Sequence, residues 1–278
     1  MSAKITQKRP MHLYRGMDKA TLDAAYNNSA AVTDSAEILI RWEDRSMQLR
    51  SSRASLLVLH YATGERNRID CFDAGPGTPW LAFIHGGYWQ MRAKETFHFV
   101  AAGPLALGIS VAFIGYTLAP EKRLDGIVAE ISAALDILTQ RVGAIHLSGW
   151  SAGAHLVAMS MGHPAVKSGL AMSGIYDLEP MRLCYVNDKL GLDKDEVVRN
   201  SPIALPTPSK PLLIAYGGSE LTELQRQSVS YFQTLQIQRT NLHALERLDG
   251  HHHFSILEGL ASPTGALALA AARLTTVR

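Results

Sequence analysis

Apolar and polar positions along the chain alternate between short continuous runs and longer segments with helical spacing. Residues 55–62 and 67–74 flank a turn at Thr63-Gly64-Glu65, which predicts an antiparallel hairpin. After Pro76, apolar runs recur that carry almost no polar positions, a pattern typical of parallel strands buried on both faces. The predicted strands cover residues 55–62, 67–74, 79–87, 109–116, 144–150, 168–174, 211–218 and 243–250.

The segments between these runs carry apolar residues at helical intervals. In residues 126–142, Ile127, Ile131, Leu135 and Leu138 share one helix face. Strands that alternate with amphipathic helices predict an α/β fold, with a mostly parallel eight-stranded sheet and helices on both faces. The other predicted helices cover residues 95–108, 154–162, 222–238 and a final segment that starts near Ser255.

Two segments fall outside the alternation, residues 1–50 and residues 176–208. Insertions above the carboxyl ends of parallel strands usually shape a binding site. We therefore expect one domain over residues 1–278, with a small cap or lid built from these two segments.

Composition excludes several classes of protein. Apolar residues make up 47 % of the 278 positions, which is enough for one large core. With 27 basic and 25 acidic residues the net charge is +2, so no basic field is present for nucleic acid or anionic lipid. We expect a small-molecule substrate as the partner, without nucleic acid or membrane, and the sequence leaves a homodimer open.

The ends of the chain and its cysteines bear on its compartment. The N-terminal residues are polar and do not resemble a secretory signal, and no run approaches the length of a membrane span. Cys71 and Cys184 lie far apart in the sequence, which favours two reduced thiols over a disulfide. A cytoplasmic protein is the expectation.

The most informative stretch is LSGWSAGAH, residues 147–155. Ser151 follows an apolar run and precedes a predicted helix, as a Gly-x-Ser-x-Gly nucleophile elbow requires. Its turn is strained, so the positions two before and two after it must be small, and Gly149 and Gly153 meet that need. An ordinary turn serine is the alternative, which the strand–turn–helix context disfavours.

A nucleophilic serine needs a base and an acid that orients the base. In this kind of fold the acid and then the histidine follow the serine in the chain. Glu220 stands just past one predicted strand, and His251, His252 and His253 follow the last one. Asp249 is the second candidate acid, but it lies very close in sequence to the histidines. Consecutive imidazoles point in different directions, so we expect no metal site among them.

A second cluster of glycines, at the end of the third predicted strand, is suited to an oxyanion hole. Glycines let backbone N–H groups approach a substrate closely. We expect the N–H groups of Gly86, Gly87 and Ala152 to face one oxyanion, and His85 to anchor the loop. A loop with glycines used only for turning is the alternative.

Three aromatic residues stand beside the expected site and are candidates for substrate binding. Tyr88, Trp89 and Trp150 could stack on an aromatic leaving group, although ordinary packing explains large aromatics equally well.

The motifs HGGYW, GYTLAP and GWSAGAH resemble the hormone-sensitive-lipase-like branch of the α/β-hydrolases. The stretches GGSELTELQRQS and DLEPMRLCYVNDKLGLD are similar to those of the kynurenine formamidase (arylformamidase) group and its bacterial esterase relatives. The resemblance runs from Tyr14 to Leu257. It places the catalytic acid at Glu220, and it selects His253 because the family histidine precedes a phenylalanine, here Phe254.

The resemblance implies a serine hydrolase that cleaves a small amide or ester through an acyl-enzyme, without a cofactor. An aryl-formamide is the first expectation and a short-acyl ester the alternative. A non-catalytic receptor of the same fold is less favoured, because the histidine is present. Two positions depart from the family pattern: the acid is often Asp rather than Glu220, and Gly115 stands where related lipases often carry Asp.

Overall fold

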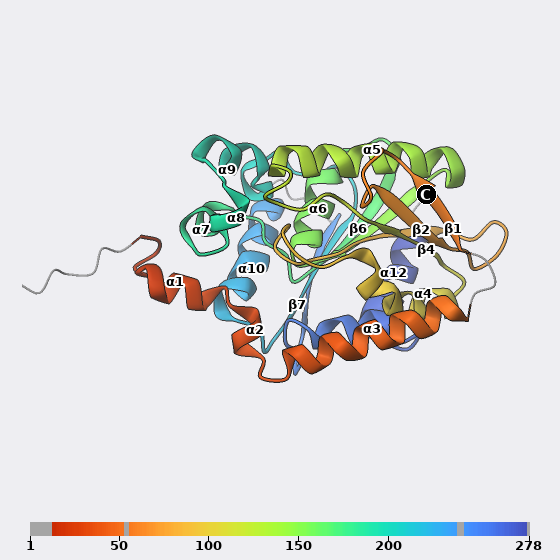
Figure 1. Cartoon of the computed structure of the whole chain (residues 1–278), viewed down its shortest axis with the longest axis horizontal. Helices are drawn as coiled ribbons and strands as arrows, with labels where there is room; N and C mark the ends of the chain where they lie inside the picture. Colours follow the sequence, from red (N-terminus) through yellow and green to blue (C-terminus); the bar gives the residue numbers. More distant parts are fainter. Residues whose placement is uncertain (1–12, 53–55, 238–241, 277–278) are drawn as a thin grey trace, which may run out of the picture.

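The apolar runs form one eight-stranded sheet in the order β1-β2-β4-β3-β5-β6-β7-β8, in a computed structural model that describes residues 13–52, 56–237 and 242–276 (Figure 1). Strands β1 and β2 form the predicted hairpin, β2 also pairs antiparallel with β4, and the other neighbours are parallel. The predicted mostly parallel sheet is confirmed. The strands are β1 (Leu57–His60), β2 (Arg68–Phe72), β3 (Trp80–Ile84), β4 (Ser110–Ile114), β5 (Ile145–Trp150), β6 (Val166–Met172), β7 (Leu212–Gly217) and β8 (His243–Leu248).

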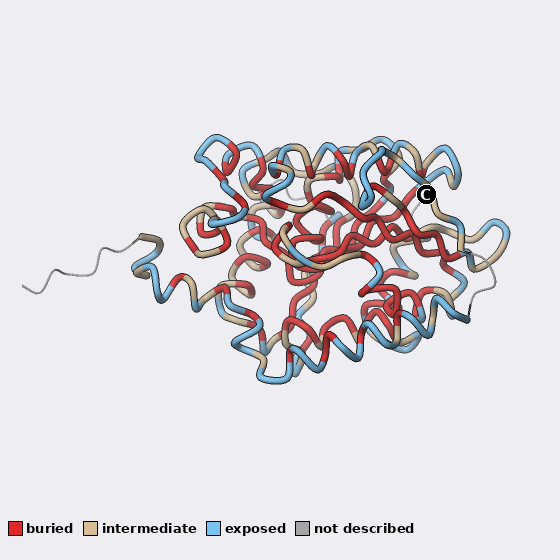
Figure 2. Tube along the Cα trace, in the orientation of Figure 1, coloured by how far each residue is buried: buried red, intermediate tan, exposed pale blue. Residues whose placement is uncertain are grey.

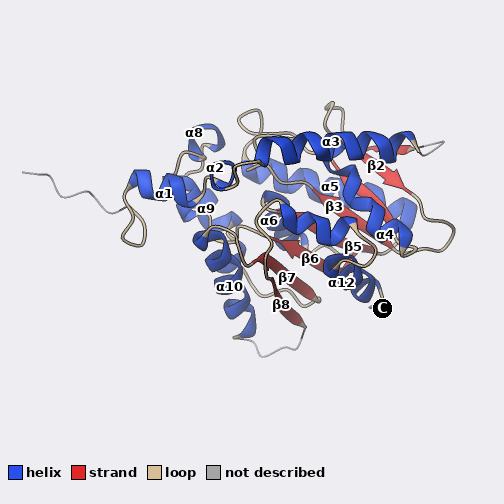
Figure 3. Cartoon of the chain, turned by 90° about the horizontal axis from the view of Figure 1, so that it is seen from below, coloured by secondary structure: helices blue, strands red, loops and turns tan. Residues whose placement is uncertain are grey.

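Helices connect and cover the strands (Figure 3). The α-helices are α1 (Lys19–Ala25), α2 (Asn28–Ala31), α3 (Ser35–Ser51), α4 (Ala102–Ala106), α5 (Leu124–Val142), α6 (Ala152–Ser160), α7 (Glu179–Leu183), α8 (Asn187–Leu190), α9 (Lys194–Asn200), α10 (Thr222–Gln236), α11 (Glu258–Ala261) and α12 (Ala266–Thr275). Three 3₁₀ segments are η1 (Lys94–Ala101), η2 (Pro202–Ala204) and η3 (Ser255–Leu257).

The sheet separates two layers of core. Successive strand residues point to opposite faces, so in β3 Ala82 and Ile84 join one apolar cluster while Leu81 and Phe83 join the other. Helices α5, α6 and α10 contribute to the first cluster, and α3, η1 and α12 to the second. The buried trace therefore runs through the centre of the molecule between two covered faces, as Figure 2 shows.

The N-terminal segment divides between cap and core, which corrects the expectation of one cap over residues 1–50. Helix α3 lies along the sheet (Figure 1), and Ile38, Leu39 and Trp42 belong to the second core cluster. The apolar face of α3 is buried mainly against η1, where Trp42 stacks on Phe99, and Trp42 also meets Trp150 at the end of β5. Residues 1–12 of the expected cap lie outside the described part of the chain.

The segment that contains α1 and α2 does meet the 176–208 insertion, as expected of a cap. The hydroxyl of Tyr14 donates to Asp177 at 2.7 Å, and the backbone N–H of Tyr185 donates to Asp23 at 2.8 Å. Gln227 of α10 accepts from the backbone of Asp177 at 2.8 Å. Helices α1, α2, α7, α8 and α9 accordingly gather at one end of the molecule, on the left in Figure 1.

The final helix that the sequence predicts from about Ser255 is divided into η3, α11 and α12, because the chain turns at residues 262–265. Leu267, Ala268 and Ala271 of α12 are buried in the second cluster. Within the described residues no single helix is long and apolar enough to cross a membrane; the segments Ser255–Ala261 and Ala266–Thr275, bent by 51°, pass that test only as a pair.

Candidate active site

Ser151 occupies a sharp turn between β5 and α6. Its φ of 58° and ψ of −119° lie in a region that residues other than glycine rarely adopt. A Cβ on Gly149 would lie 2.4 Å from the carbonyl oxygen of Gly153, and one on Gly153 would lie 2.0 Å from that of Ile84. Both glycines are therefore required by the close approach of β3, β5 and α6, and the strained turn lifts the serine above the strand end.

Three side chains from distant parts of the chain form one hydrogen-bonded series. The Ser151 Oγ lies 3.1 Å from Nε2 of His253, and Nδ1 of His253 lies 3.2 Å from Oε2 of Glu220. All three residues are buried. The structure thus brings together the serine, base and acid that the sequence suggests, in the geometry of a catalytic triad.

The carboxylate of Glu220 is fixed by two further donors. The Ser173 hydroxyl and the backbone N–H of Gly217 each donate to Oε1 at 2.6 Å. The extra methylene of Glu relative to Asp is accommodated because the side chain folds back over its own turn to reach Gly217. Asp249, the second candidate acid, is exposed instead and pairs with Arg247 at 2.8 Å.

Sequence reasoning missed Ser173, which follows β6. It is fully buried and has a φ of 54°, another unusual value for a residue other than glycine. A polar residue directly after a buried strand was the only available signal. Its hydroxyl orients the acid, which in turn orients His253.

The three consecutive histidines have separate surroundings. His251 Nδ1 lies 3.1 Å from the carbonyl oxygen of Ser255, and His252 Nδ1 accepts from the backbone N–H of Phe254 at 3.2 Å. Only His253 of the three faces Ser151. Across the described residues no group of three or more His, Cys, Asp or Glu side chains is arranged to hold a metal ion.

Trp150 holds the loop that carries the histidine. Its indole N–H donates to the carbonyl oxygen of His253 at 2.8 Å, and its ring lies 4.7 Å from the imidazole. Trp42 of α3 packs edge-on against Trp150 at 5.6 Å. The second core cluster therefore supports the position of His253 through Trp42 and Trp150.

The expected oxyanion-hole residues surround the serine. A Cβ on Gly86 would lie 3.0 Å from Cβ of Ser151, so this backbone passes directly beside the nucleophile. Gly87 has a φ of 110°, which favours glycine strongly. Ala152 is the first residue of α6, and its N–H has no intrahelical partner. These groups can stabilise negative charge that develops next to Ser151.

His85 serves as an anchor of this loop. Its ring stacks on Tyr116 at 4.3 Å, and the Tyr116 hydroxyl donates to the carbonyl oxygen of His85 at 2.9 Å. Burial lowers the pKa of His85 to about 4, so the ring is neutral at pH 7.

A small pocket of about 40 Å³ opens beside the serine. Its lining contains residues that sequence reasoning did not single out, from α2, from the loop after Gly87 and from the loop after His253. The lining residues are Asn28, Ser29, Gly87, Tyr88, Met91, Arg92, Trp150, Ser151, His253 and Phe254.

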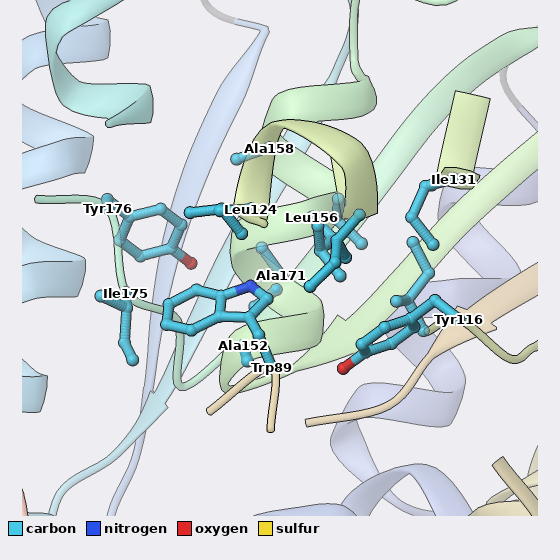
Figure 4. Packing of buried hydrophobic residues seen from close by; sticks show 14 of the residues in the cluster. Trp89, Tyr116, Leu124, Ile131, Ala152, Leu156, Ala158, Ala171, Ile175 and Tyr176 are labelled. Carbon is cyan, nitrogen blue, oxygen red and sulfur yellow. The ribbon is translucent and has the colours of Figure 1, made fainter. Parts of the chain in front are cut away.

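The pocket corrects two expectations about substrate contact. Trp89 does not line it: the indole is fully buried and meets His155 edge-on at 4.9 Å. It lies in the first core cluster with Ala152 and Ile175 (Figure 4). The 176–208 insertion also contributes no lining residue; it packs behind the wall, where Tyr185 meets Tyr88 edge-on at 6.4 Å.

The fold and the comparisons with known proteins show to which class of protein the chain belongs. A family model described as alpha/beta hydrolase fold matches residues 81–202, which include the glycine loop and the serine. The crystal structure of an esterase from Pyrobaculum calidifontis superposes with a TM-score of 0.69, at 19 % identity, over 90 % of this chain and 96 % of that chain. The protein is a hydrolase with the α/β-hydrolase fold.

More specific relatives are kynurenine formamidases. Those of Danio rerio and Salmo salar are each 28 % identical to this chain, over 89 % and 90 % of its length and 93 % and 94 % of theirs. A crystal structure from Silicibacter sp., of a protein described as a candidate thioesterase, is 29 % identical, with a TM-score of 0.83 over 89 % of this chain and 97 % of that chain. The predicted resemblance to the kynurenine formamidase group is therefore confirmed.

Proposed function

We propose that the protein hydrolyses a small aryl-formamide through a formyl-enzyme on Ser151. The observation that carries the proposal is the buried series Ser151–His253–Glu220, set beside the backbone of Gly86. The kynurenine formamidase relatives support the choice of substrate.

Acylation begins at the serine. His253 Nε2 accepts the proton of the Ser151 hydroxyl as the oxygen attacks the formyl carbon, which contributes roughly 10²–10⁴-fold. Glu220 accepts from Nδ1 of His253, so the imidazole keeps one tautomer and its charge is stabilised. The N–H groups of Gly86, Gly87 and Ala152 stabilise the oxyanion, each by about 10²–10³-fold.

Collapse of the tetrahedral intermediate releases the amine. His253 now gives its proton to the leaving nitrogen, the C–N bond breaks and the formyl group stays on Ser151. Water then attacks the formyl ester with His253 as base, and formate leaves as the serine regains its proton. Every proton is returned, so the cycle needs no cofactor.

Arg92 supports a substrate that also carries a carboxylate. It lines the pocket and is half buried, and burial lowers the pKa of its guanidinium without neutralising it. The nearby charge of Glu43 acts against the effect of burial on this pKa, and none of the ion pairs among the described residues includes Arg92. A carboxylate on the substrate, as in N-formylkynurenine, would pair with this charge.

A short-acyl carboxylesterase is the second candidate, since it uses the same groups and the esterase structures share the fold. Steady-state rates on N-formylkynurenine and p-nitrophenyl acetate, at matched enzyme concentration, separate the two. We expect a higher kcat/KM on the formamide. A negligible formamide rate beside a substantial ester rate would reject the first proposal and favour the second.

Labelling with a fluorophosphonate tests the nucleophile itself. Wild-type protein should form a covalent adduct on Ser151, because His253 activates its hydroxyl. A protein that is a receptor of the same fold would stay unlabelled.

A further inference from the structure

Asn28 is a buried polar residue in the wall of the active-site pocket. It begins α2, only 6 % of its surface is exposed, and it lines the same pocket as Ser151 and His253. The proposed mechanism assigns it no task.

The hydrogen bonds of Tyr88 fix the orientation of the Asn28 amide. The hydroxyl of Tyr88 lies 2.5 Å from the carbonyl oxygen of Tyr26, which can only accept, so the single hydroxyl proton is used there. Burial raises the pKa of Tyr88 well above its usual value, so this proton is retained. Tyr88 must then accept from Nδ2 of Asn28, at 3.0 Å.

This orientation leaves the amide oxygen without a donor. Oδ1 of Asn28 is buried and has no hydrogen-bond partner among the described residues. A buried acceptor without a partner is unfavourable. A ligand in the pocket that supplies an N–H would satisfy it.

We propose that Asn28 is a specificity residue that accepts a hydrogen bond from the N–H of the scissile amide. This inference rests on the proposed formamidase function. An aryl-formamide carries one N–H beside its carbonyl, and the corresponding aryl ester carries none. Asn28 would therefore favour amides over esters that contain the same acyl and aryl groups.

The same contact would assist the departure of the amine. The leaving nitrogen must receive the proton of His253 on its lone pair before the C–N bond breaks. A hydrogen bond from the N–H to Asn28 holds the opposite side of this nitrogen and turns the lone pair toward the imidazole. An ester oxygen has two lone pairs and needs no such orientation.

Formanilide and phenyl formate form a matched pair of probes, because they differ only in N–H against oxygen. Both give the same formyl-enzyme, so deacylation is identical and kcat/KM reports acylation. For Asn28→Ala, we expect kcat/KM on formanilide to fall about 10- to 100-fold, with a change below about 3-fold on phenyl formate. Asn28→Leu, which keeps more of the side-chain volume, should show the same selective loss.

Asn27→Ala is the control, because exposed Asn27 caps α2 through Ala30 without lining the pocket. It should leave the formanilide-to-ester ratio unchanged, and thermal unfolding should show that each variant is folded. Wild-type protein gives an independent test: N-methylformanilide, which lacks the N–H, should react at least about 10-fold more slowly than formanilide.

These measurements distinguish a failure of the proposed function from a failure of the proposed role of Asn28. If wild-type protein cleaves phenyl formate but not formanilide, the proposed function fails and takes this inference with it. If wild-type protein cleaves formanilide and the Asn28 variants lose both activities equally, or neither, only the role of Asn28 is rejected. An N-methylformanilide rate equal to that of formanilide rejects it as well.

Discussion

The series Ser151–His253–Glu220, here called the catalytic series, and the pocket wall around Asn28 and Tyr88 are built in different ways. Ser151, Glu220 and His253 follow the parallel strands β5, β7 and β8, so the sheet itself delivers them to one edge. The wall around Asn28 and Tyr88 depends on contacts between segments more than fifty residues apart. The three residues of the proposed chemistry are thus placed by regular structure, and the residues of the proposed specificity by the packing of irregular segments on it.

This difference separates two kinds of mutational effect. A change in the series should reduce turnover of every substrate by the same factor, because each reaction uses the same serine and base. A change in the wall should alter the ratio between substrates. The variants below test that division, from the largest expected effect to the smallest.

Ser151→Ala removes the nucleophile and should lower kcat by roughly 10⁴- to 10⁶-fold on formamide and ester substrates alike. The oxyanion hole remains, so a small residual rate should persist. Steady-state kinetics on both substrates check this, with thermal unfolding as the control for folding. A loss confined to one substrate would contradict the shared nucleophile.

Glu220→Gln keeps the shape of the acid and removes its charge. We expect kcat to fall about 10³- to 10⁴-fold on both substrates, because the imidazolium loses its stabilising partner. Glu220→Asp keeps the charge but shortens the reach toward Gly217 and Ser173, so its kcat should fall less than that of Glu220→Gln. Equal losses in the two variants would show that geometry, rather than charge, limits the rate.

Arg92→Ala should act on substrates according to their charge. On N-formylkynurenine we expect KM to rise about 10-fold, because one charged hydrogen-bonded pair is lost. Formanilide has no carboxylate, so its KM should change little. A parallel rise for both compounds would mean that Arg92 only supports the wall.

Tyr185→Phe tests the insertion behind the wall. The Tyr185 hydroxyl donates to the carbonyl oxygen of Tyr26 at 3.3 Å, a long contact outside the pocket lining. We expect kcat/KM on formanilide to change by less than about 3-fold. A loss comparable with that of Asn28→Ala would place the 176–208 insertion in the binding wall after all.

Much of the fold could be predicted from periodicity because burial imposes it locally. The runs that form β3, β5 and β7 are apolar at almost every position, as strands covered on both faces must be. Helix α3 was harder to place. Its amphipathic pattern shows that one face is buried, but a cap and the main core both offer apolar partners, and only the packing of Trp42 on η1 decides between them.

Ser151, Glu220 and His253 could be predicted from the sequence for a similar local reason. A strained serine turn demands glycines at fixed spacing, and acid and histidine must follow strand ends. No local sequence pattern marks Asn28 and Arg92 as lining residues of the pocket. Trp89 is the same residue type as Trp150, which lines the pocket, and yet it lies in the core.

By itself, the sequence determined the strand–helix order, the elbow around Ser151 and the order of acid and base, because each is enforced by bonds and burial within a short stretch of chain. Only the tertiary structure decided which residues line the pocket. Asn28 of α2 lines the pocket, and the hydrogen bonds that join it to Tyr88 and Tyr88 to Tyr26 connect segments that no local pattern relates. The direction of a buried hydrogen bond is settled by all of its partners together.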